Sequence, residues 1–254
     1  MRLRLIGIGP GGPDDLTVTA VKALESVDVF LVADKARGVD DLVMVREQIL
    51  RRHTSGRYRT IVVPDPPRDR APEQYATEVR DWHAARADAY EQVLRTEVDD
   101  SETAGFLVWG DPSLYDSTIR VVERIRERGV LDIDYDVIPA VSSIQVLAAR
   151  HRLVFNRIGG PITITTGRRL GVEVASGADN IVVMLDGQLA CRELDGNWDI
   201  WWGANLGTSD EELVAGRLGE VLETIETARA RAKALRGWVM DTYLLRRADR
   251  AVSG

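Results

Sequence analysis

The sequence has one cysteine, Cys191, and three histidines among its 254 residues. A single cysteine excludes an internal disulfide and any zinc or iron–sulfur site built from several cysteines. The histidines, His53, His83 and His151, are not spaced as the ligands of a transition metal. We therefore expect no metal site, and a protein of a reducing compartment, the cytoplasm.

Positive charge and long apolar runs are also scarce. The 33 Lys and Arg residues against 40 Asp and Glu residues give a net charge of −7, which is the wrong sign for non-specific binding to DNA or RNA. The apolar runs are far shorter than the ~20 residues that span a bilayer. The first of them reaches Gly7 and Pro10 before a signal peptide could form. We expect no nucleic-acid partner and no membrane partner.

The chain does have the length and the apolar material for two domains, since 44% of its 254 residues are hydrophobic. Residues 3–8 predict a buried strand that ends in a Gly-rich loop, residues 16–24 a helix, and residues 27–32 a second strand. Such a strand–helix–strand unit predicts a parallel sheet covered by helices. Further helices are expected over 39–50, 75–93, 119–125 and 141–149, and further strands over 60–63, 105–109 and 134–138.

The pattern changes near the Gly159-Gly160-Pro161 cluster, which we interpret as a joint between domains. After it, strands are expected over 161–166, 180–185, 199–204, 212–218 and 237–245, with a charged helix over 220–236. The predicted fold is therefore two α/β domains, residues 1–157 with a mostly parallel sheet and residues 158–254 with a mixed sheet.

The loop from Gly7 to Gly12 satisfies the Gly-x-Gly-x-x-Gly pattern of a dinucleotide site, and Asp34 ends the next predicted strand. This pattern keeps an NAD-dependent oxidoreductase open as an alternative. However, Pro10 has no N–H to offer a pyrophosphate, and Pro13 delays the start of the helix.

Five segments, in order along the chain, resemble the signatures of one enzyme family. They are residues 5–17 around the Gly-rich loop, 109–115 with Gly-Asp-Pro, 139–143 with Pro-Ala-Val-Ser-Ser, 183–186, and 203–208. On these segments the chain resembles the tetrapyrrole (precorrin and uroporphyrinogen) methyltransferases, the class III S-adenosylmethionine-dependent family. It departs from the family at Ala140, where most members have glycine.

The resemblance implies an active-site cleft between the two domains, S-adenosyl-L-methionine as cofactor, S-adenosyl-L-homocysteine as its product, and a homodimer. It places the cofactor contacts on these residues: Pro10, Gly110, Asp111, Leu114, Tyr115, Ser142, Ser143, Met184, Ala204, Leu206 and Gly207. Taken singly, each is explained as well by a turn, a helix cap or a core position. Their shared order along the chain is what favours the cofactor site.

Residues 201–208 and 237–247 further resemble the deacetylating subfamily of aerobic cobalamin biosynthesis. Its reaction methylates precorrin-5 at C-1 and releases acetate, which gives precorrin-6A. Within the family, the alternatives are another precorrin methyltransferase or a methyltransferase like diphthine synthase, which acts on a protein side chain.

Release of acetate needs a base and an acid. Asp34 is the predicted base, because open α/β sheets bind ligands at the carboxyl ends of their strands. Tyr115 is the predicted proton donor.

A tetrapyrrole of this pathway is a polycarboxylate, so a protein of net charge −7 must bind it through local arginines, which pair with carboxylates in a bidentate manner. The predicted substrate-binding residues are Arg150, Arg152 and Arg157 near the joint and Arg168 after the next strand. The arginines within 51–59 are the alternative.

Overall fold

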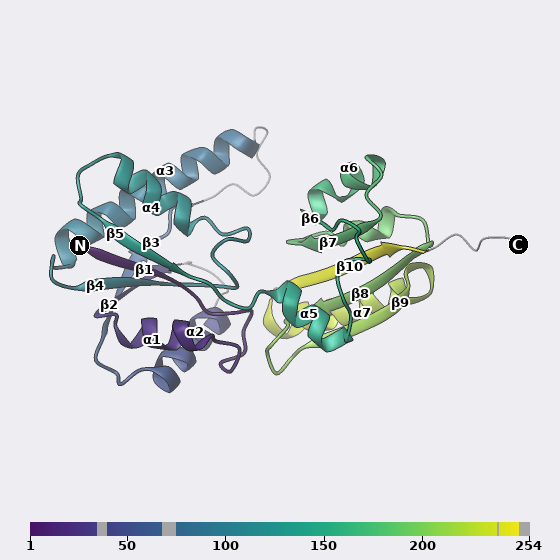
Figure 1. Cartoon of the computed structure of the whole chain (residues 1–254), viewed down its shortest axis with the longest axis horizontal. Coiled ribbons are helices and arrows are strands. Elements are labelled where there is room, and N and C mark those ends of the chain that lie inside the picture. The colour runs from purple at the N-terminus through teal and green to yellow at the C-terminus, as the bar shows by residue number, and fades with distance from the viewer. Residues whose placement is uncertain (35–39, 68–74, 238, 249–254) are drawn as a thin grey trace, which may run out of the picture. The chain divides into compact units, whose positions relative to one another are not determined.

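The computed structural model describes residues 1–34, 40–67, 75–237 and 239–248, which form the two compact units of Figure 1, Met1–Val141 and Ser142–Gly254. Each unit is built around one five-stranded sheet. The division falls after Val141, whereas the sequence analysis placed it after residue 157. The physical reason is that α5 (Ser143–His151) packs on strands of the second sheet.

The sheet of the first unit is entirely parallel, with the strand order β3-β2-β4-β1-β5. This confirms the predicted parallel sheet and places β1 between β4 and β5. The strands are β1 (Arg2–Gly7), β2 (Val29–Asp34), β3 (Arg59–Pro64), β4 (Thr103–Val108) and β5 (Asp134–Ile138).

Helices cover both faces of this sheet, with α1 and α2 on one face and α3 and α4 on the other (Figure 1). Leu5 of β1 is buried in the core that contains residues of α3 and α4, and its neighbour Ile6 in the core that contains residues of α1 and α2. Burial on both faces explains why residues 3–8 form a nearly continuous apolar run. The helices are α1 (Val18–Glu25), α2 (Asp40–His53), α3 (Tyr75–Glu97) and α4 (Thr118–Glu127).

The second sheet is mixed, as predicted, with the order β6-β7-β10-β8-β9. Only β6 and β7 are parallel, and the other neighbours are antiparallel. The strands are β6 (Thr163–Thr166), β7 (Asn180–Met184), β8 (Trp198–Ala204), β9 (Glu212–Arg217) and β10 (Asp241–Arg247).

Helix α7 (Leu218–Arg236) packs on one face of this sheet over Trp202 and Tyr243, which are fully buried. Helix α5 covers the other face, where Leu147 lies against Gly203. A short helix α6 (Leu170–Ala175) and two 3-10 turns, η1 (Gly167–Arg169) and η2 (Ala190–Glu193), complete the unit.

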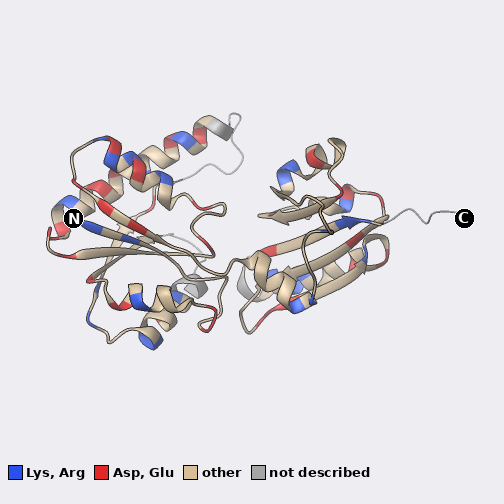
Figure 2. Cartoon of the chain, viewed as in Figure 1, with Lys and Arg blue, Asp and Glu red and all other residues tan. Residues whose placement is uncertain are grey.

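Acidic and basic residues are interspersed along the helices of both units (Figure 2). No helix in the described part of the chain is both long enough and apolar enough to cross a membrane.

Candidate active site

Three loops leave neighbouring strands at the carboxyl edge of the first sheet. They follow β1, β4 and β5, and they contain three of the segments on which the family resemblance rests. The first two loops are joined directly: the N–H of Gly9 donates to the carbonyl of Gly110 at 3.3 Å, and the N–H of Gly110 donates back to Gly9 at 2.9 Å. Parallel pairing thus brings together residues about a hundred positions apart in the sequence.

Gly7 is the point at which the three loops meet. A Cβ atom on Gly7 would lie 2.7 Å from the Cβ of Ala140, 2.8 Å from Cδ of Pro112 and 3.1 Å from the carbonyl oxygen of Gly110. Ala140 is not among the described residues with positive φ, so alanine fits there without backbone strain. Ala140, which replaces the family's usual glycine, is therefore accommodated because it lies against Gly7, which has no side chain.

Asp111 links the second loop to the third. One carboxylate oxygen accepts the N–H of Ser113 at 2.9 Å and the Ser113 hydroxyl, and the other accepts the N–H of Ala140 at 2.8 Å. Partial burial disfavours the charged carboxylate, but the hydrogen bonds from Ser113 and Ala140 outweigh this effect and lower the pKa of Asp111. The ionised carboxylate of Asp111 therefore joins the two loops through hydrogen bonds, in addition to any contact with a ligand.

Pro10 is buried within the Gly-rich loop. Helix α1 begins only at Val18, with Thr17 as its N-cap, whereas the helix of a dinucleotide site opens within the glycine motif. The carbonyl of Pro13 accepts a hydrogen bond from Nε2 of His53 at 2.8 Å, which fixes the loop to the end of α2. This geometry gives no support to the NAD alternative.

The loop after β4 ends in Leu114, which is partly buried, and Tyr115. Tyr115 has φ 53°, in the left-handed region, and 46% of its surface is exposed. This backbone conformation costs a tyrosine ~1–3 kcal/mol, and residues strained in this way cluster at functional sites. Asp34 is the last residue of β2, opposite Pro64 of β3, and its side chain lies outside the described part of the structure. Its role as the base stays a prediction.

Ser142 and Ser143 open helix α5. Ser142 forms a capping box with Gln145: its hydroxyl accepts the N–H of Ile144 at 3.2 Å, and its own N–H donates to Oε1 of Gln145 at 3.0 Å. The hydroxyl of Ser143 lies 3.0 Å from that of Thr242 in β10. Helix capping thus explains why a serine stands at position 142. A cofactor contact of Ser142 or Ser143 stays a prediction.

In the second unit, the predicted cofactor residues lie on both sides of β10. Met184 ends β7 opposite Thr242, and Ala204 ends β8 opposite Asp241. Leu206 packs over Gly203, where a Cβ atom would lie 2.7 Å from Cδ2 of the leucine. Pairing with β10 therefore brings these segments together.

Gly207 turns the chain after β8 with φ 80°, and its N–H donates to Oε2 of Glu211 at 2.8 Å. Between Ala204 and Leu206, Asn205 is buried and left-handed, with φ 50°. Its Nδ2 is buried and has no hydrogen-bond partner in the described part of the structure. A buried amide without a partner is costly, so this segment has an unused donor beside the predicted cofactor residues.

A buried polar network beneath this segment was missed by the sequence analysis. Tyr243 donates to Oδ2 of Asp186 at 2.5 Å, Arg229 donates through Nη2 to the Asp186 carbonyl at 2.8 Å, and its Nε donates to Asp241 at 2.9 Å. Burial raises the pKa of Asp241 despite Arg229 and the indole N–H of Trp202. Asp241 is the first residue of β10 and Asp186 lies two residues after the end of β7, and this position at strand ends is a sequence signal that could have pointed to them.

The four predicted substrate arginines lie in different surroundings. Arg150 is 2.7 Å from Glu211, and Arg157 is 3.4 Å from Asp179 and donates to the Arg247 carbonyl at 2.5 Å, so the protein's own groups occupy both. Arg152 is exposed and caps α5 in the left-handed conformation.

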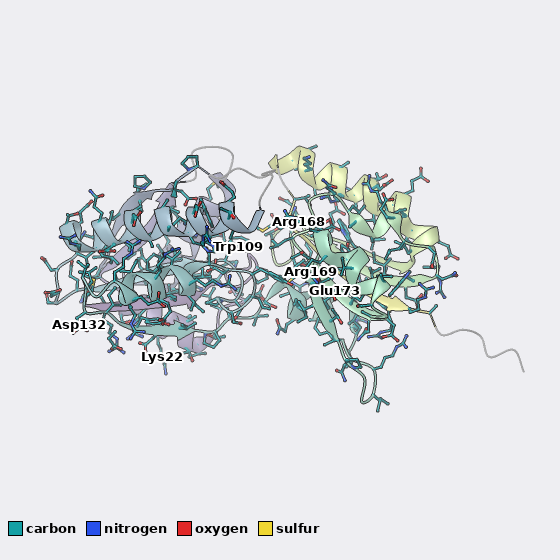
Figure 3. The ribbon with its side chains drawn as sticks, turned by 90° about the horizontal axis from the view of Figure 1, so that it is seen from above. Lys22, Trp109, Asp132, Arg168, Arg169 and Glu173 are labelled. Atoms are coloured by element: carbon teal, nitrogen blue, oxygen red, sulfur yellow. The ribbon has the colours of Figure 1, made fainter. Side chains whose placement is uncertain are left out.

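Arg168 is exposed on η1. Figure 3 labels it together with Arg169 and Glu173, which form an ion pair at 3.0 Å. Substrate binding by Arg150, Arg152, Arg157 and Arg168 remains a prediction.

Comparison with known proteins identifies the family. The model of the Tetrapyrrole (Corrin/Porphyrin) Methylases matches residues 2–222. The chain belongs to this family. It is 44% identical to the precorrin-6A synthase [deacetylating] of Sinorhizobium sp over 97% of this chain and 95% of that protein.

Two solved structures extend the comparison. A cobalamin synthesis related protein from Corynebacterium diphtheriae is 38% identical with a TM-score of 0.84, over 98% of this chain and 100% of that one. The uroporphyrin-III C-methyltransferase from Thermus thermophilus, solved with S-adenosyl homocysteine, is 18% identical with a TM-score of 0.58, over 96% of this chain and 97% of that one. The first supports the family, and the second shows a shared fold.

Proposed function

We propose that this tetrapyrrole methylase is an S-adenosylmethionine-dependent C-methyltransferase that methylates precorrin-5 at C-1 and releases acetate, giving precorrin-6A. The observation that carries the proposal is the 44% identity to a precorrin-6A synthase [deacetylating] over nearly the full length of both chains. The joined loops after β1, β4 and β5 add support, because they contain the family's signature segments in one place.

The proposed cofactor residues fall into two sets, one in each unit. Pro10, Gly110, Asp111, Leu114 and Tyr115 belong to the first unit, and Ser142, Ser143, Met184, Ala204, Leu206 and Gly207 to the second. Two features fit a bound nucleoside with an amino-acid tail. Gly110 has open space where a Cβ would stand, so a ligand can approach its backbone, and Asn205 has an unused amide donor.

S-adenosylmethionine supplies the methyl group from its sulfonium when it is bound. The protein's part in that step is to hold the donor and acceptor carbons in line, and no metal is needed. For the release of acetate, we propose that Asp34 takes a proton from the water that adds to the acetyl carbonyl. The carbon–carbon bond to the ring then breaks, and Tyr115 returns a proton to the ring carbon. The ring gives up one proton as C-1 accepts the methyl group, so that precorrin-5, water and the transferred methyl cation give precorrin-6A, acetate and two protons.

The test is incubation of the protein with precorrin-5 and S-adenosylmethionine. We expect a product of the mass of precorrin-6A together with one equivalent of free acetate. A methylated product without acetate would mean a different member of the family. Calorimetric titration completes the test: binding of NAD without binding of S-adenosylhomocysteine would refute a methyltransferase.

We also propose that the protein acts in the cytoplasm as a homodimer. The support is the family resemblance together with the sparse cysteine content. Light scattering coupled to size exclusion gives the mass in solution, and a mass near 28.2 kDa would contradict the dimer.

A further inference from the structure

Asn205 lies in the turn after β8, between the predicted cofactor residues Ala204 and Leu206, and only 3% of its surface is exposed. Its N–H donates to the carbonyl of Met240 at 2.8 Å, and its carbonyl accepts the N–H of Thr208 at 3.1 Å. These bonds hold the residue at the end of the second sheet, next to the start of β10. The side chain is therefore fixed beside the predicted cofactor residues.

The side-chain amide of Asn205 uses its oxygen but not its nitrogen. Oδ1 accepts the N–H of Met240 at 3.4 Å, whereas Nδ2 is buried and has no hydrogen-bond partner among the described residues. Met240 fixes the assignment of the two atoms, because the reverse orientation would set two N–H donors against each other. A buried donor without an acceptor is rare in native proteins and lowers their stability. Nδ2 therefore requires an acceptor that the described part of the chain does not supply.

The charged groups at this turn disfavour an anionic acceptor. Glu211 accepts the N–H of Gly207 through Oε2 at 2.8 Å. Asp241, opposite Ala204 in the sheet, is paired with Arg229 at 2.9 Å, so the charge of this arginine is already neutralised. The carboxylates of the cofactor tail and of the tetrapyrrole are therefore poor partners for Nδ2. A neutral acceptor fits better.

The other groups around the turn are apolar. Leu206 lies over Gly203, and Leu147 of α5 contacts the same glycine from 3.0 Å. Ala204, Leu206 and Leu147 are all buried. An apolar surface with one precisely placed donor matches a flat ring whose edge carries acceptors. Within S-adenosylmethionine this is the adenine ring, whose nitrogens N1, N3 and N7 accept hydrogen bonds and cannot donate them.

We propose that Nδ2 of Asn205 donates to a ring nitrogen of the cofactor's adenine, and that Asn205 thereby makes the site specific for an adenine nucleoside. The inference rests on the proposed function for the use of S-adenosylmethionine. A ring nitrogen would complete the hydrogen bonds of the amide, so that binding recovers the free energy that the unpaired donor costs the ligand-free protein. The ribose hydroxyls are the other neutral acceptors of the nucleoside, and the experiment separates the two.

The backbone of Asn205 decides which variants are informative. Its φ of 50° lies in the left-handed region, which glycine and aspartate also tolerate. Asn205→Gly removes the amide, and Asn205→Asp keeps its shape and the acceptor for Met240 but replaces Nδ2 by an oxygen. The matched control is Asn180→Asp in β7. Asn180 is also 3% exposed, but its Nδ2 donates to the carbonyls of Phe155 at 2.8 Å and Pro161 at 3.2 Å.

The ligands are S-adenosylhomocysteine and two sets of its analogues. The 1-deaza, 3-deaza and 7-deaza analogues each lack one ring nitrogen, and the 2′-deoxy and 3′-deoxy analogues each lack one ribose hydroxyl. Calorimetry at pH 8 gives the dissociation constants, and circular dichroism with urea denaturation verifies folding. Methyl transfer to precorrin-5 and acetate release are measured separately.

We expect one deaza analogue to bind the wild type about tenfold more weakly than S-adenosylhomocysteine, because it leaves Nδ2 unpaired. Asn205→Gly and Asn205→Asp should bind S-adenosylhomocysteine about tenfold more weakly and no longer discriminate against that analogue. Their discrimination against the deoxy analogues should equal that of the wild type. Asn180→Asp should lower the urea midpoint and leave every dissociation constant unchanged.

Equal binding of all three deaza analogues and S-adenosylhomocysteine by the wild type would overturn the proposal. So would wild-type affinity in both Asn205 variants, or weaker binding that keeps the wild-type ratios for every deaza analogue, as a purely structural asparagine would give. A ratio that changes only for a deoxy analogue would assign the donor to the ribose instead.

The proposed function can fail separately. A wild type that shows the expected discrimination but transfers no methyl group to precorrin-5 would refute the proposed function and leave the adenine contact standing. Methyl transfer with acetate release, without any effect of the Asn205 variants on binding, would do the reverse. A wild type that does not bind S-adenosylhomocysteine would overturn both.

Discussion

At the scale of single residues, the candidate active site depends on a few backbone and carboxylate positions. Gly7 gives the three loops room to meet, Asp111 ties two of them, and Tyr115 holds a left-handed backbone. The Gly-x-Gly pattern predicted a tight loop at Gly7 but not the reason for it, because the contact with Ala140 joins residues far apart in the sequence.

Gly7 tests the packing of the loops. We expect Gly7→Ala to lower the free energy of unfolding by ~1–3 kcal/mol, because the new methyl group meets Ala140 and Pro112 at under 3 Å. Gly171→Ala is the matched control: nothing lies within 4 Å of its Cβ and it sits in helix α6, so it should be neutral or stabilise slightly. Equal effects of the two changes in urea denaturation would contradict the crowding at Gly7.

Asp111 predicts a pH dependence. Its pKa in the folded protein is lowered, so its contribution to stability is complete above the ordinary value of 3.8 and is lost as the pH falls through the folded pKa. Asp111→Asn should therefore destabilise at pH 7 and lose that effect progressively as the pH falls below 3.8. Denaturant midpoints for both proteins across this range measure it, and a difference that does not depend on pH would show that ionisation of Asp111 plays no part.

Asp34 and Tyr115 are the predicted base and proton donor for the release of acetate. We expect Asp34→Asn and Tyr115→Phe each to lower turnover by ~10²-fold or more, the usual contribution of a general base or acid. Asp34→Asn should retain the cofactor affinity, because Asp34 is not among the proposed cofactor residues. Acetate release and methyl transfer are measured together in single-turnover reactions. Normal acetate release by both variants would remove these residues from the mechanism.

At the scale of helices and strands, the second unit depends on the network around Arg229. This residue connects α7 to Asp241 at the start of β10 and to the carbonyl of Asp186 after β7. Its guanidinium thus fixes the strand ends next to Met184 and Ala204, which are predicted to contact the cofactor.

Arg229→Met tests this network. We expect a loss of ~3–5 kcal/mol at pH 7, because Asp241 would be left as a buried charge without its partner. The loss should shrink toward pH 4, since the pKa of Asp241 is already raised and protonation removes the charge. The control, Arg231→Met, removes an ion pair with Glu212 from a side chain that is 58% exposed and should cost no more than about 1 kcal/mol. Similar losses for both variants in urea denaturation would contradict the network.

The spacing of the apolar residues along the sequence was enough to predict most helices and strands. An element buried on one face repeats apolar residues with its own period, and a strand buried on both faces is a continuous apolar run. Residues 134–138 are predicted and observed as a strand, and the helix predicted from 75 is α3. Helix α6 was missed because Leu170–Ala175 is too short to show a period. The network of Asp186, Arg229 and Tyr243 could not be predicted from the sequence, because these residues are far apart in the chain and only the fold brings them together.

At the scale of the whole molecule, the division into units differs from the sequence prediction. The Gly159-Gly160-Pro161 cluster is a local signal for a turn, and it lies within the second unit. Helix α5 precedes that cluster but packs on β8 and β10, and no local pattern shows which sheet a helix will cover.

The cofactor proposal predicts a response in both units. Saturation with S-adenosylhomocysteine at 100 times its dissociation constant should stabilise the protein by ~2.7 kcal/mol. It should also slow amide hydrogen exchange both at residues 7–13 and 110–115 and at residues 203–208. NAD at the same concentration is the control and should protect neither set. Protection confined to one unit would restrict the cofactor site to that unit.

The central place of β1 has a consequence for biosynthesis. The first strand to be made pairs with β4 and β5, so its partners follow only with residues 103 and 138. At ~5–20 residues per second, both edges of β1 are unpaired for roughly 5–20 s, until β4 ends at residue 108, and one edge stays unpaired until β5 ends at residue 138. During that time its apolar residues are open to association with other chains. The nascent first unit is therefore a natural client for chaperones that cover apolar segments, and slow translation before β5 would prolong its need for them.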